Sequence, residues 1–252
     1  MLQVEDITIC FGNLIAVNDV CMEVPERKII ALIGPNGAGK TTLFNCLSGV
    51  CKPDQGEIIF KEAKITGLRP SAIHNLGISR TYQIINLFDD MPVIDNVMIG
   101  MHGDLKANFF DSLFHSKKHR VEENERYEQA HKLLKLVGLE DRAYETAGSL
   151  AYGEQRLLEI VRALASNPKL LLLDEPAAGM NSKEKEELDI ILRKILELYD
   201  LSILLVEHDM DLVMGISDHV HVLSFGKMIA SGSPEEIQVN PDVIEAYLGG
   251  DD

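Results

Sequence analysis

The sequence has no apolar run long enough to cross a bilayer. Its apolar stretches, such as Leu170–Leu173 and Leu201–Val206, have the length of β-strands, whereas a transmembrane helix needs about 18 or more apolar residues. The first residues, Met1–Asp6, are partly acidic and have no apolar core of the kind found in a secretory signal peptide. We therefore expect a soluble chain that contacts a membrane only through a partner.

The sequence is also short of positive charge. It has 24 Lys and Arg against 40 Asp and Glu in 252 residues, which gives a net charge of −16. Surfaces that bind nucleic acid are rich in basic side chains that neutralise phosphates. The composition therefore argues against a nucleic-acid partner, and the length allows one large domain or two small ones.

Cysteines are few and lack the spacing of a metal site. The four, at positions 10, 21, 46 and 51, lie in the first fifth of the chain and form no C-x-x-C pair. Structural zinc sites usually take their ligands from two close pairs. We expect buried free thiols in a reducing compartment instead.

The sequence does contain a glycine-rich loop between a predicted strand and a predicted helix. The segment Gly34–Thr42 follows the apolar run Ile29–Ile33 and precedes the helical pattern of Leu43, Phe44 and Leu47. Its first eight residues match the phosphate-binding motif G-x-x-x-x-G-K-[ST] in the context that the motif requires. An ordinary glycine-rich turn is the alternative.

The residue types in this loop suit a triphosphate. Glycines let the backbone N–H groups point inward, where a Cβ would block the triphosphate, and the following helix adds the partial positive charge of its N-terminus. We predict that Lys40 reaches the β- and γ-phosphates and that the Thr41 hydroxyl binds Mg²⁺. The nucleotide-contacting residues of the loop are predicted to be Gly34, Pro35, Asn36, Gly37, Ala38, Gly39, Lys40, Thr41 and Thr42.

Polar residues follow two further predicted strands. Leu170–Leu173 is apolar on both faces, as in a central parallel strand, and Asp174 and Glu175 follow it directly. Ligand sites in such sheets form at the carboxyl ends of strands, so we predict that Asp174 holds Mg²⁺ and Glu175 polarises the attacking water. His208, after Leu201–Val206, is expected to touch the γ-phosphate. The alternatives are a simple turn for the carboxylates and a structural histidine.

Three other features each allow two interpretations. Phe11, on a predicted turn between strands, is either a core aromatic or a platform for a nucleotide base. The apolar loop Ile84–Phe88 is either a docking surface or the cover of a small satellite core. Gly153, at the start of a predicted helix, either caps that helix or leaves its N-terminus open to an anion.

The segment 93–164 is predicted to be mainly helical. Val121–Val137 is amphipathic, and Gly138 is placed to end that helix. Gly100–Lys118 has no regular period, and the basic patch Lys117–Arg120 is expected on a solvated face.

Taken in order, these segments resemble the nucleotide-binding subunit of ATP-binding cassette (ABC) transporters over essentially the whole chain. The matching motifs are Gly34–Thr41 as the Walker A loop, Gln83 as the Q-loop, Leu150–Glu154 as the signature, Leu170–Glu175 as Walker B, Ala178–Asn181 as the D-loop and His208 as the switch histidine. Within the family, the chain is most similar to the ATPases of branched-chain amino acid importers, through Leu150–Gly153, Asp174–Asn181, Glu207–Met210 and Glu245–Gly249.

The resemblance implies an α/β fold: a P-loop NTPase core with a parallel central sheet, an N-terminal antiparallel β subdomain and an inserted helical subdomain. The first part of the ATP-binding core is expected at 1–92, the helical signature subdomain at 93–164 and the second part of the core at 165–252, within one ABC domain. The tail is expected to add a hairpin across Phe225–Lys227 and a last helix toward Leu248 that serves only for packing.

The resemblance also implies how the site works. Two such subunits close around two ATP molecules, and each ATP lies between one subunit's Walker A loop and the other's signature helix. The implied catalytic residues are Glu175, His208, Gln83 and Lys40, and the implied metal-binding residues are Thr41, Gln83 and Asp174. Beyond the loop, the implied nucleotide contacts are Phe11, Ala151, Tyr152 and Gly153.

The function implied by the resemblance is a Mg²⁺-dependent ATPase that powers the import of branched-chain or related amino acids. The expected partners are transmembrane permease subunits, a second ABC ATPase subunit, identical or different, and the solute-binding protein of the same system. Gln83 would link site occupancy to the permease, which the loop Ile84–Phe88 would contact at the cytoplasmic face of the membrane. The alternatives are a stand-alone non-transport ABC ATPase and a nucleotide-gated regulatory subunit that does not hydrolyse ATP.

Three residues depart from the wider family pattern. Ala151 replaces the usual Ser of the signature and removes one hydroxyl that would reach the γ-phosphate. Glu154 replaces Gln, and its charge is tolerable near a helix N-terminus but repulsive if it faces the triphosphate. Asn181 replaces the usual Asp of the D-loop. These departures concern the half of the site that a second subunit supplies.

Overall fold

The structure, a computed structural model, describes residues 1–101 and 117–248, with the backbone alone for 117–122 and 248. The interpretations of most of Gly100–Lys118 and of the side chains of Lys117–Arg120 lie outside the described residues. The chain falls into two compact units, Met1–Gln83 with Lys169–Asp252, and Ile84–Pro168. The division of the sequence at 92/93 and 164/165 stays a prediction.

The first unit begins with an antiparallel sheet in the order β2-β1-β4-β5. Its strands are β1 (Leu2–Phe11), β2 (Leu14–Val24), β4 (Gln55–Phe60) and β5 (Ala63–Lys64). Alternate residues of β1 and β2 are buried, as expected for a sheet with one covered face. The N-terminal strands and the turn between them form as the sequence predicted.

A six-stranded sheet in the order β10-β9-β3-β8-β7-β6 forms the centre of this unit. Its strands are β3 (Ile29–Ile33), β6 (Ile78–Arg80), β7 (Leu170–Asp174), β8 (Ser202–Val206), β9 (His219–Ser224) and β10 (Lys227–Gly232). All neighbouring pairs are parallel except β9 and β10, which form the predicted hairpin. Every residue of β3, β7 and β8 is buried, because both faces of a parallel sheet are covered.

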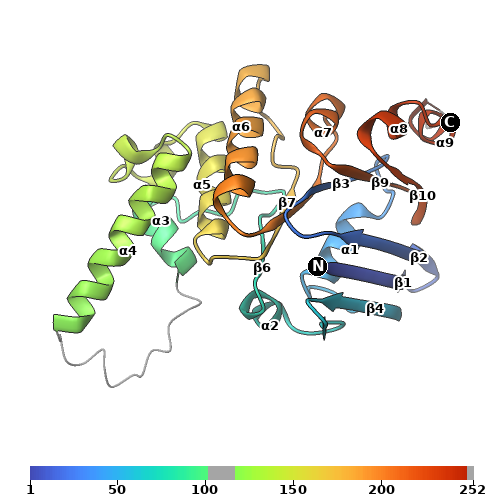
Figure 1. Ribbon diagram of the computed structural model, residues 1–252, viewed down its shortest axis with the longest axis horizontal. Coiled ribbons are helices and arrows are strands. Elements are labelled where there is room, and N and C mark those ends of the chain that lie inside the picture. Colours follow the sequence, from blue (N-terminus) through green and yellow to red (C-terminus); the bar gives the residue numbers. More distant parts are fainter. Residues whose placement is uncertain (102–116, 249–252) are drawn as a thin grey trace. The chain divides into compact units, whose positions relative to one another are not determined.

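The core of the first unit joins the two sheets through α1 (Lys40–Leu47) (Figure 1). Leu43, Phe44 and Leu47 of α1 share one buried cluster with alternate residues of the central strands and the inner face of the antiparallel sheet. The other helices of this unit are α2 (Pro70–Asn75), α6 (Ser182–Leu198), α7 (Met210–Ile216), α8 (Pro234–Gln238) and α9 (Pro241–Leu248). The helix that begins at the glycine-rich loop is therefore anchored in the core.

The second unit is helical, as predicted. It contains α3 (Val93–Gly100), α4 (Lys117–Leu136), α5 (Tyr152–Leu164) and two short 3-10 helices, η3 (Glu140–Arg142) and η4 (Ala147–Ser149). The helix α3 packs against α4 and α5, and Gly138, with φ 73°, follows α4 in the left-handed conformation that ends many helices. Within the described parts of both units, no helix combines the length and the apolar character that a membrane span requires.

The cysteines are free thiols, but the expectation that all are buried is wrong. Only Cys46 is buried, and burial raises its pKa to about 12. Cys21 is exposed because it lies on the outer face of β2, between the buried Val20 and Met22. Its Sγ donates to Asp6 Oδ1 at 3.0 Å.

Candidate active site

The glycine-rich loop lies between β3 and α1, as predicted, and its glycines are needed for their backbone conformation. Gly34, Gly37 and Gly39 have φ values of 148°, 77° and 102°, a region that other residues rarely adopt. A Cβ at Gly34 would lie 1.9 Å from the carbonyl oxygen of Leu223, and one at Gly39 would lie 2.4 Å from that of Ala16. At these two positions a side chain would therefore collide with neighbouring backbone of the protein itself. The sequence predicts a collision with the triphosphate only.

Lys40 is held inside this loop. Its Nζ donates to the carbonyl oxygens of Gly34 at 2.6 Å and of Pro35 at 2.9 Å. Burial lowers the pKa of Lys40, and the negative charges of Glu175 and Asp174 oppose this shift. The ammonium group thus lies where the loop and the two predicted strand-end carboxylates meet.

The loop opens on a cleft of about 490 Å³ in the first unit. The cleft collects residues that lie far apart in the sequence. Its lining includes the predicted site residues Phe11, Asn36, Gly37, Ala38, Gly39, Lys40, Thr41, Thr42, Gln83, Glu175 and His208. The first unit therefore brings together every predicted residue with a catalytic role.

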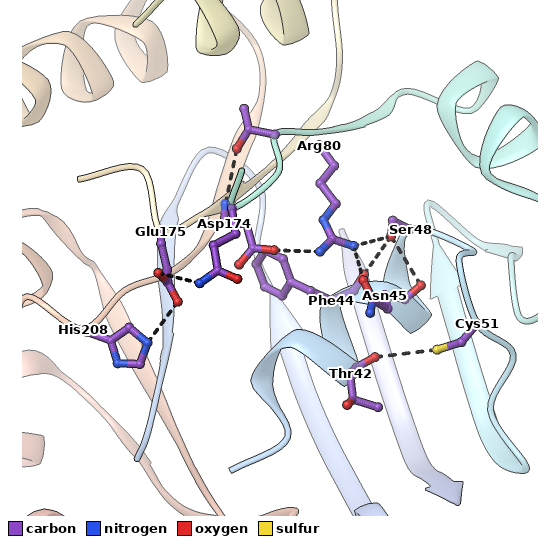
Figure 2. Close-up of polar contacts among 11 residues, drawn as sticks. Thr42, Phe44, Asn45, Ser48, Cys51, Arg80, Asp174, Glu175 and His208 are labelled. Carbon is purple, nitrogen blue, oxygen red and sulfur yellow. Dashed lines mark hydrogen bonds and ion pairs between the residues drawn. The ribbon is translucent and has the colours of Figure 1, made fainter. Parts of the chain in front are cut away.

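Glu175 is the centre of the polar contacts in this cleft (Figure 2). Its Oε2 accepts a hydrogen bond from Gln83 Nε2 at 3.1 Å, and its Oε1 lies 3.1 Å from His208 Nε2. Its backbone has φ 50°, in the left-handed region that is unfavourable for a residue with a Cβ. Such strain is often found at functional sites, and here it accompanies a carboxylate held from both sides.

Glu207 is a functional candidate that the sequence pattern left without a role. Glu207 is 3% exposed, and its carboxylate accepts from the backbone N–H of Ala177 at 2.7 Å and of His208 at 2.9 Å. Glu207 thus joins the loop after β7 to the loop after β8, which fixes His208 relative to Glu175. The signal in the sequence is its place directly before His208, at the end of a buried strand.

Asp174 lies at the end of β7 and is 2% exposed. Its Oδ2 accepts from Arg80 Nη2 at 2.7 Å, and its backbone N–H donates to Thr81 Oγ1 at 3.3 Å. The described residues contain no group of three or more His, Cys, Asp or Glu side chains that could hold a metal by themselves. A hydroxyl at Thr41 and one carboxylate at Asp174 nevertheless fit Mg²⁺, which takes oxygen ligands and completes its shell with water and substrate phosphates.

Two aromatic side chains lie at the edge of the cleft. Phe11 is 56% exposed, so the interpretation of a core aromatic is wrong, and its role as a base platform stays a prediction. Phe225, at the tip of the β9–β10 hairpin, is 93% exposed and has φ 44°. The hairpin is tied to the phosphate loop, because Gly226 N donates to Ala38 O at 2.9 Å. The sequence pattern marked Phe225 only as part of a turn.

The signature residues lie at the start of α5, in the second unit. Ala151 is the N-cap residue and accepts no side-chain hydrogen bond, and Tyr152 and Gly153 are the first two residues of the helix. Gly153 therefore does not cap the helix. Glu154 Oε2 accepts from Ala151 N at 2.8 Å and is paired with the guanidinium of Arg142. Contact between this helix start and a nucleotide stays a prediction.

Asn181 and Tyr247 have roles that the sequence did not reveal. Asn181 is the N-cap of α6, where its Oδ1 accepts from the backbone N–H groups of Lys183 and Glu184 at 3.0 and 3.1 Å. The usual Asp could make the same bonds. Tyr247 of α9 lies beside the backbone of Gly34, which opposes the rise in the pKa of Tyr247 that burial causes. The tail thus contacts the phosphate loop, which corrects the expectation that it serves only for packing.

The loop after Gln83 exposes two large apolar side chains. Ile84 is 83% exposed and Phe88 is 50% exposed, so the satellite-core interpretation is wrong for these two residues. The backbone of the loop is nevertheless held. Asn96, which is fully buried, accepts from Phe88 N at 2.9 Å and donates to Phe88 O at 3.2 Å, and Arg162 donates to Asn86 O at 2.6 Å.

Another pocket, of about 550 Å³, lies beside β1, β2 and β9 in the first unit. Its polar groups largely satisfy one another. Lys28 forms an ion pair with Asp218 at 2.6 Å, and Ser231 Oγ bonds both His219 and His221. Because these groups have partners and the phosphate loop lines the smaller cleft, we assign the chemistry to the smaller one.

Comparison with known protein families identifies the family to which the chain belongs. Residues 17–178 match the family described as "ABC transporter". The chain belongs to the ABC transporter family. Residues 227–252 also match the family described as "Branched-chain amino acid ATP-binding cassette transporter". The predicted family and its ATPase class are confirmed, and as a member of this family the protein binds nucleotide.

Individual relatives of this ABC protein cover nearly its whole length. It is 47% identical to the high-affinity branched-chain amino acid transport ATP-binding protein LivG of Salmonella typhimurium, over 99% of the chain and 98% of the relative. It is 45% identical to the corresponding protein BraF of Pseudomonas aeruginosa, with the same coverage.

Solved structures support the predicted α/β cassette fold. A nucleotide-free ATP-binding cassette from an ABC transporter matches with a TM-score of 0.85 and 33% identity, over 98% of both chains. An ATP-binding cassette in its ADP conformation matches with a TM-score of 0.85 and 31% identity, over 99% of this chain and 98% of the other. The predicted fold class is confirmed.

Proposed function

We propose that this ABC protein hydrolyses ATP with Mg²⁺ and thereby powers the import of branched-chain or related amino acids. The observation that carries the proposal is Glu175, which lies beside the phosphate loop and is held between Gln83 and His208 at 3.1 Å from each. The solute class is supported by the LivG and BraF relatives, whose names describe them as branched-chain amino acid transport ATP-binding proteins.

The side chains of the cleft have different roles in ATP hydrolysis. Lys40 and the N-terminus of α1 attract the triphosphate, while Phe11 offers a surface for the base. Thr41 and Asp174, with Gln83, would hold Mg²⁺, which when bound neutralises charge on the β- and γ-phosphates. Glu175 orients the attacking water and accepts its proton.

We infer that a second ABC subunit completes the site. The first amides of α5, at Tyr152 and Gly153, have no side-chain cap, and a helix N-terminus of this kind favours an anion. Glu154 does not prevent this, because its carboxylate is occupied by Ala151 N and Arg142. Each ATP would then lie between the phosphate loop of one subunit and the signature helix of the other.

The remaining partners follow from the role in import. Ile84 and Phe88 offer exposed apolar contacts on a loop whose backbone is held by Asn96, which suits docking on a permease subunit. We propose that the protein lies at the cytoplasmic face of the membrane, held there by the permease. A solute-binding protein would act on the opposite side in the same system.

The relatives favour this function over the two alternatives. A stand-alone ABC ATPase of DNA repair or translation is disfavoured because the relatives, matched over nearly their whole length, are named as branched-chain amino acid transport proteins. A regulatory subunit without hydrolysis would not need Glu175 and His208 paired at 3.1 Å. Both residues are present and in contact.

Phosphate release from Mg²⁺·ATP tests the proposed activity. The wild-type protein should release phosphate, and Lys40→Ala should lose most of its ATP affinity because the only buried cation lining the cleft among the described residues is removed. Lys194→Ala, on the exposed face of α6, is a matched control. Unchanged affinity of Lys40→Ala in a nucleotide titration would contradict the assignment of the loop.

Co-purification with the permease tests the docking surface. Phe88→Ser should bind ATP normally but recover less permease, because an exposed apolar contact is lost. Ile190→Ser removes a comparably exposed apolar side chain, 64% against 50%, from α6 and should recover permease as the wild type does. Intact recovery by Phe88→Ser would exclude this loop as the contact.

A further inference from the structure

Arg80, the last residue of β6, is a buried cation that the proposed mechanism does not use. Its side chain is 6% exposed and forms an ion pair with Asp174, whose side chain is 2% exposed. Nη2 of Arg80 donates to Asp174 Oδ2 at 2.7 Å (Figure 2). A buried charge is costly unless it is paired, so each of these residues depends on the other.

The other end of the guanidinium is bound to α1. Nη1 donates to Asn45 Oδ1 and to Ser48 Oγ, both at 2.8 Å. The group also lies 5.6 Å from the centre of the Phe44 ring. Figure 2 shows Arg80 between Asp174 on one side and Asn45 and Ser48 on the other. The planar fork of an arginine makes both contacts at once, which a lysine cannot do.

This bridge joins the two elements that carry the predicted metal ligands. Thr41 lies in the first turn of α1, and Asp174 ends β7. The two residues are distant in sequence, and the bonds of Arg80 tie their elements together through side chains. The bridge occupies Oδ2 of the Asp174 carboxylate.

We propose that Arg80 is a positioning residue of the metal site: it fixes the Asp174 carboxylate relative to α1 and therefore relative to Thr41. Thr81 supports the same arrangement, since its Oγ1 accepts from the backbone of Asp174. The inference rests on the proposed function, in which Asp174 and Thr41 hold Mg²⁺. The competing explanation is that Arg80 only neutralises Asp174 and so stabilises the fold.

The test measures how much Mg²⁺ the protein needs, by two readouts. One is the free Mg²⁺ concentration for half-maximal phosphate release at saturating ATP. The other is the free Mg²⁺ concentration that gives half of the increase in the thermal unfolding midpoint of the ATP-bound protein. Loss of a residue that orients a metal ligand typically lowers metal affinity about 10–100-fold. We expect both concentrations to rise by about this factor in Arg80→Met.

Two further variants separate positioning from neutralisation. Arg80→Lys keeps the charge but loses the fork, so we expect only partial recovery, and a full return to wild-type Mg²⁺ requirement would overturn the bridge. The double variant Asn45→Ala, Ser48→Ala keeps the ion pair but removes the anchor on α1. It should raise the Mg²⁺ requirement less than Arg80→Met does, and it serves as the test if Arg80→Met does not fold.

Arg156→Met is the matched control. Arg156 forms an equally buried ion pair with Glu159, with 0% and 1% exposure, but within α5 of the second unit. It should lower the unfolding midpoint and leave the Mg²⁺ requirement unchanged. If Arg80→Met behaves like this control, Arg80 is only structural. If the wild type shows no response to Mg²⁺ in either readout, the result contradicts the proposed Mg²⁺-dependent function. It is then distinct from a failure of the role proposed for Arg80, which would appear only in the variants.

Discussion

The two units of this protein build their predicted nucleotide contacts in opposite ways. In the first unit, Glu175 takes its partners from distant segments, Gln83 and His208. In the second unit, the charged residue at the helix start, Glu154, takes its partners from nearby residues, Ala151 and Arg142. The catalytic half therefore exists only in the folded unit, whereas the signature half is a local helix terminus.

The two buried ion pairs repeat this contrast. Arg80 and Asp174 are 94 residues apart and join β6 to β7, whereas Arg156 and Glu159 are three residues apart on α5. A long-range pair fixes one element relative to another, whereas an ion pair within one helix does not by itself join two elements. Substitutions in the first unit should therefore change ATP binding and hydrolysis more than substitutions in the second unit do.

The largest effect is expected from Glu175→Gln. The variant keeps the shape and one hydrogen-bond acceptor of the side chain but removes the base, so turnover should fall by ~10² to 10⁴ while ATP still binds. Single-turnover phosphate release with a parallel binding titration measures both quantities. Glu197→Gln, an exposed acid of α6, is the control. Near-normal hydrolysis by Glu175→Gln would remove this residue from the role of base.

Acid sensitivity of the first unit should come next, through His221. Burial lowers the pKa of His221 from 6.5 to about 4. The two ring nitrogens of His221 form hydrogen bonds with Ser231 Oγ and with the carbonyl oxygen of Glu23. The unfolded chain binds this proton more readily, so the stabilisation is complete above pH 6.5 and is lost as the pH falls toward 4. The loss amounts to roughly 3 kcal/mol of the free energy of unfolding.

Urea unfolding at several pH values measures this loss. The slope of unfolding free energy against pH between 6.5 and 4 should be smaller in His221→Gln than in the wild type. An identical slope in both proteins would show that His221 does not carry the effect.

A smaller effect is expected from Phe225→Asn. The substitution removes the aromatic ring while asparagine tolerates the φ of 44°. If Phe225 adds an aromatic surface for the base, ATP affinity should fall about threefold to tenfold, whereas the affinity for tripolyphosphate, which has no base, should not change. Phe225→Tyr should retain ATP affinity. An equal loss for both ligands would show that the hairpin acts through the phosphate loop instead.

The smallest effect is expected from Glu154→Gln in the second unit. The amide oxygen can still accept from Ala151 N, and the lost ion pair with Arg142 is partly exposed, with 30% and 32% exposure of the side chains. Hydrolysis should change by less than about fivefold. A much larger increase in the rate of phosphate release would show that the carboxylate faces the triphosphate and opposes it.

The sequence allowed the fold class and the central site residues to be predicted because their signals are local. The loop motif lies within nine consecutive residues, and Asp174, Glu175 and His208 directly follow apolar strands. Arg80 and Glu207 could not be assigned roles in this way. Their partners lie in other elements, and no spacing along the chain indicates them.

Local patterns along the chain were therefore enough to predict a phosphate-binding loop, the strands that end beside it and the residue types for ATP chemistry. The folded chain was needed to see that Phe11 is exposed, that Gln83 and His208 hold Glu175, and that Arg80 bridges Asp174 to α1. The physical reason is that motifs follow from local spacing and backbone preference. Burial and hydrogen-bond partners depend on which distant segments the parallel sheet brings side by side.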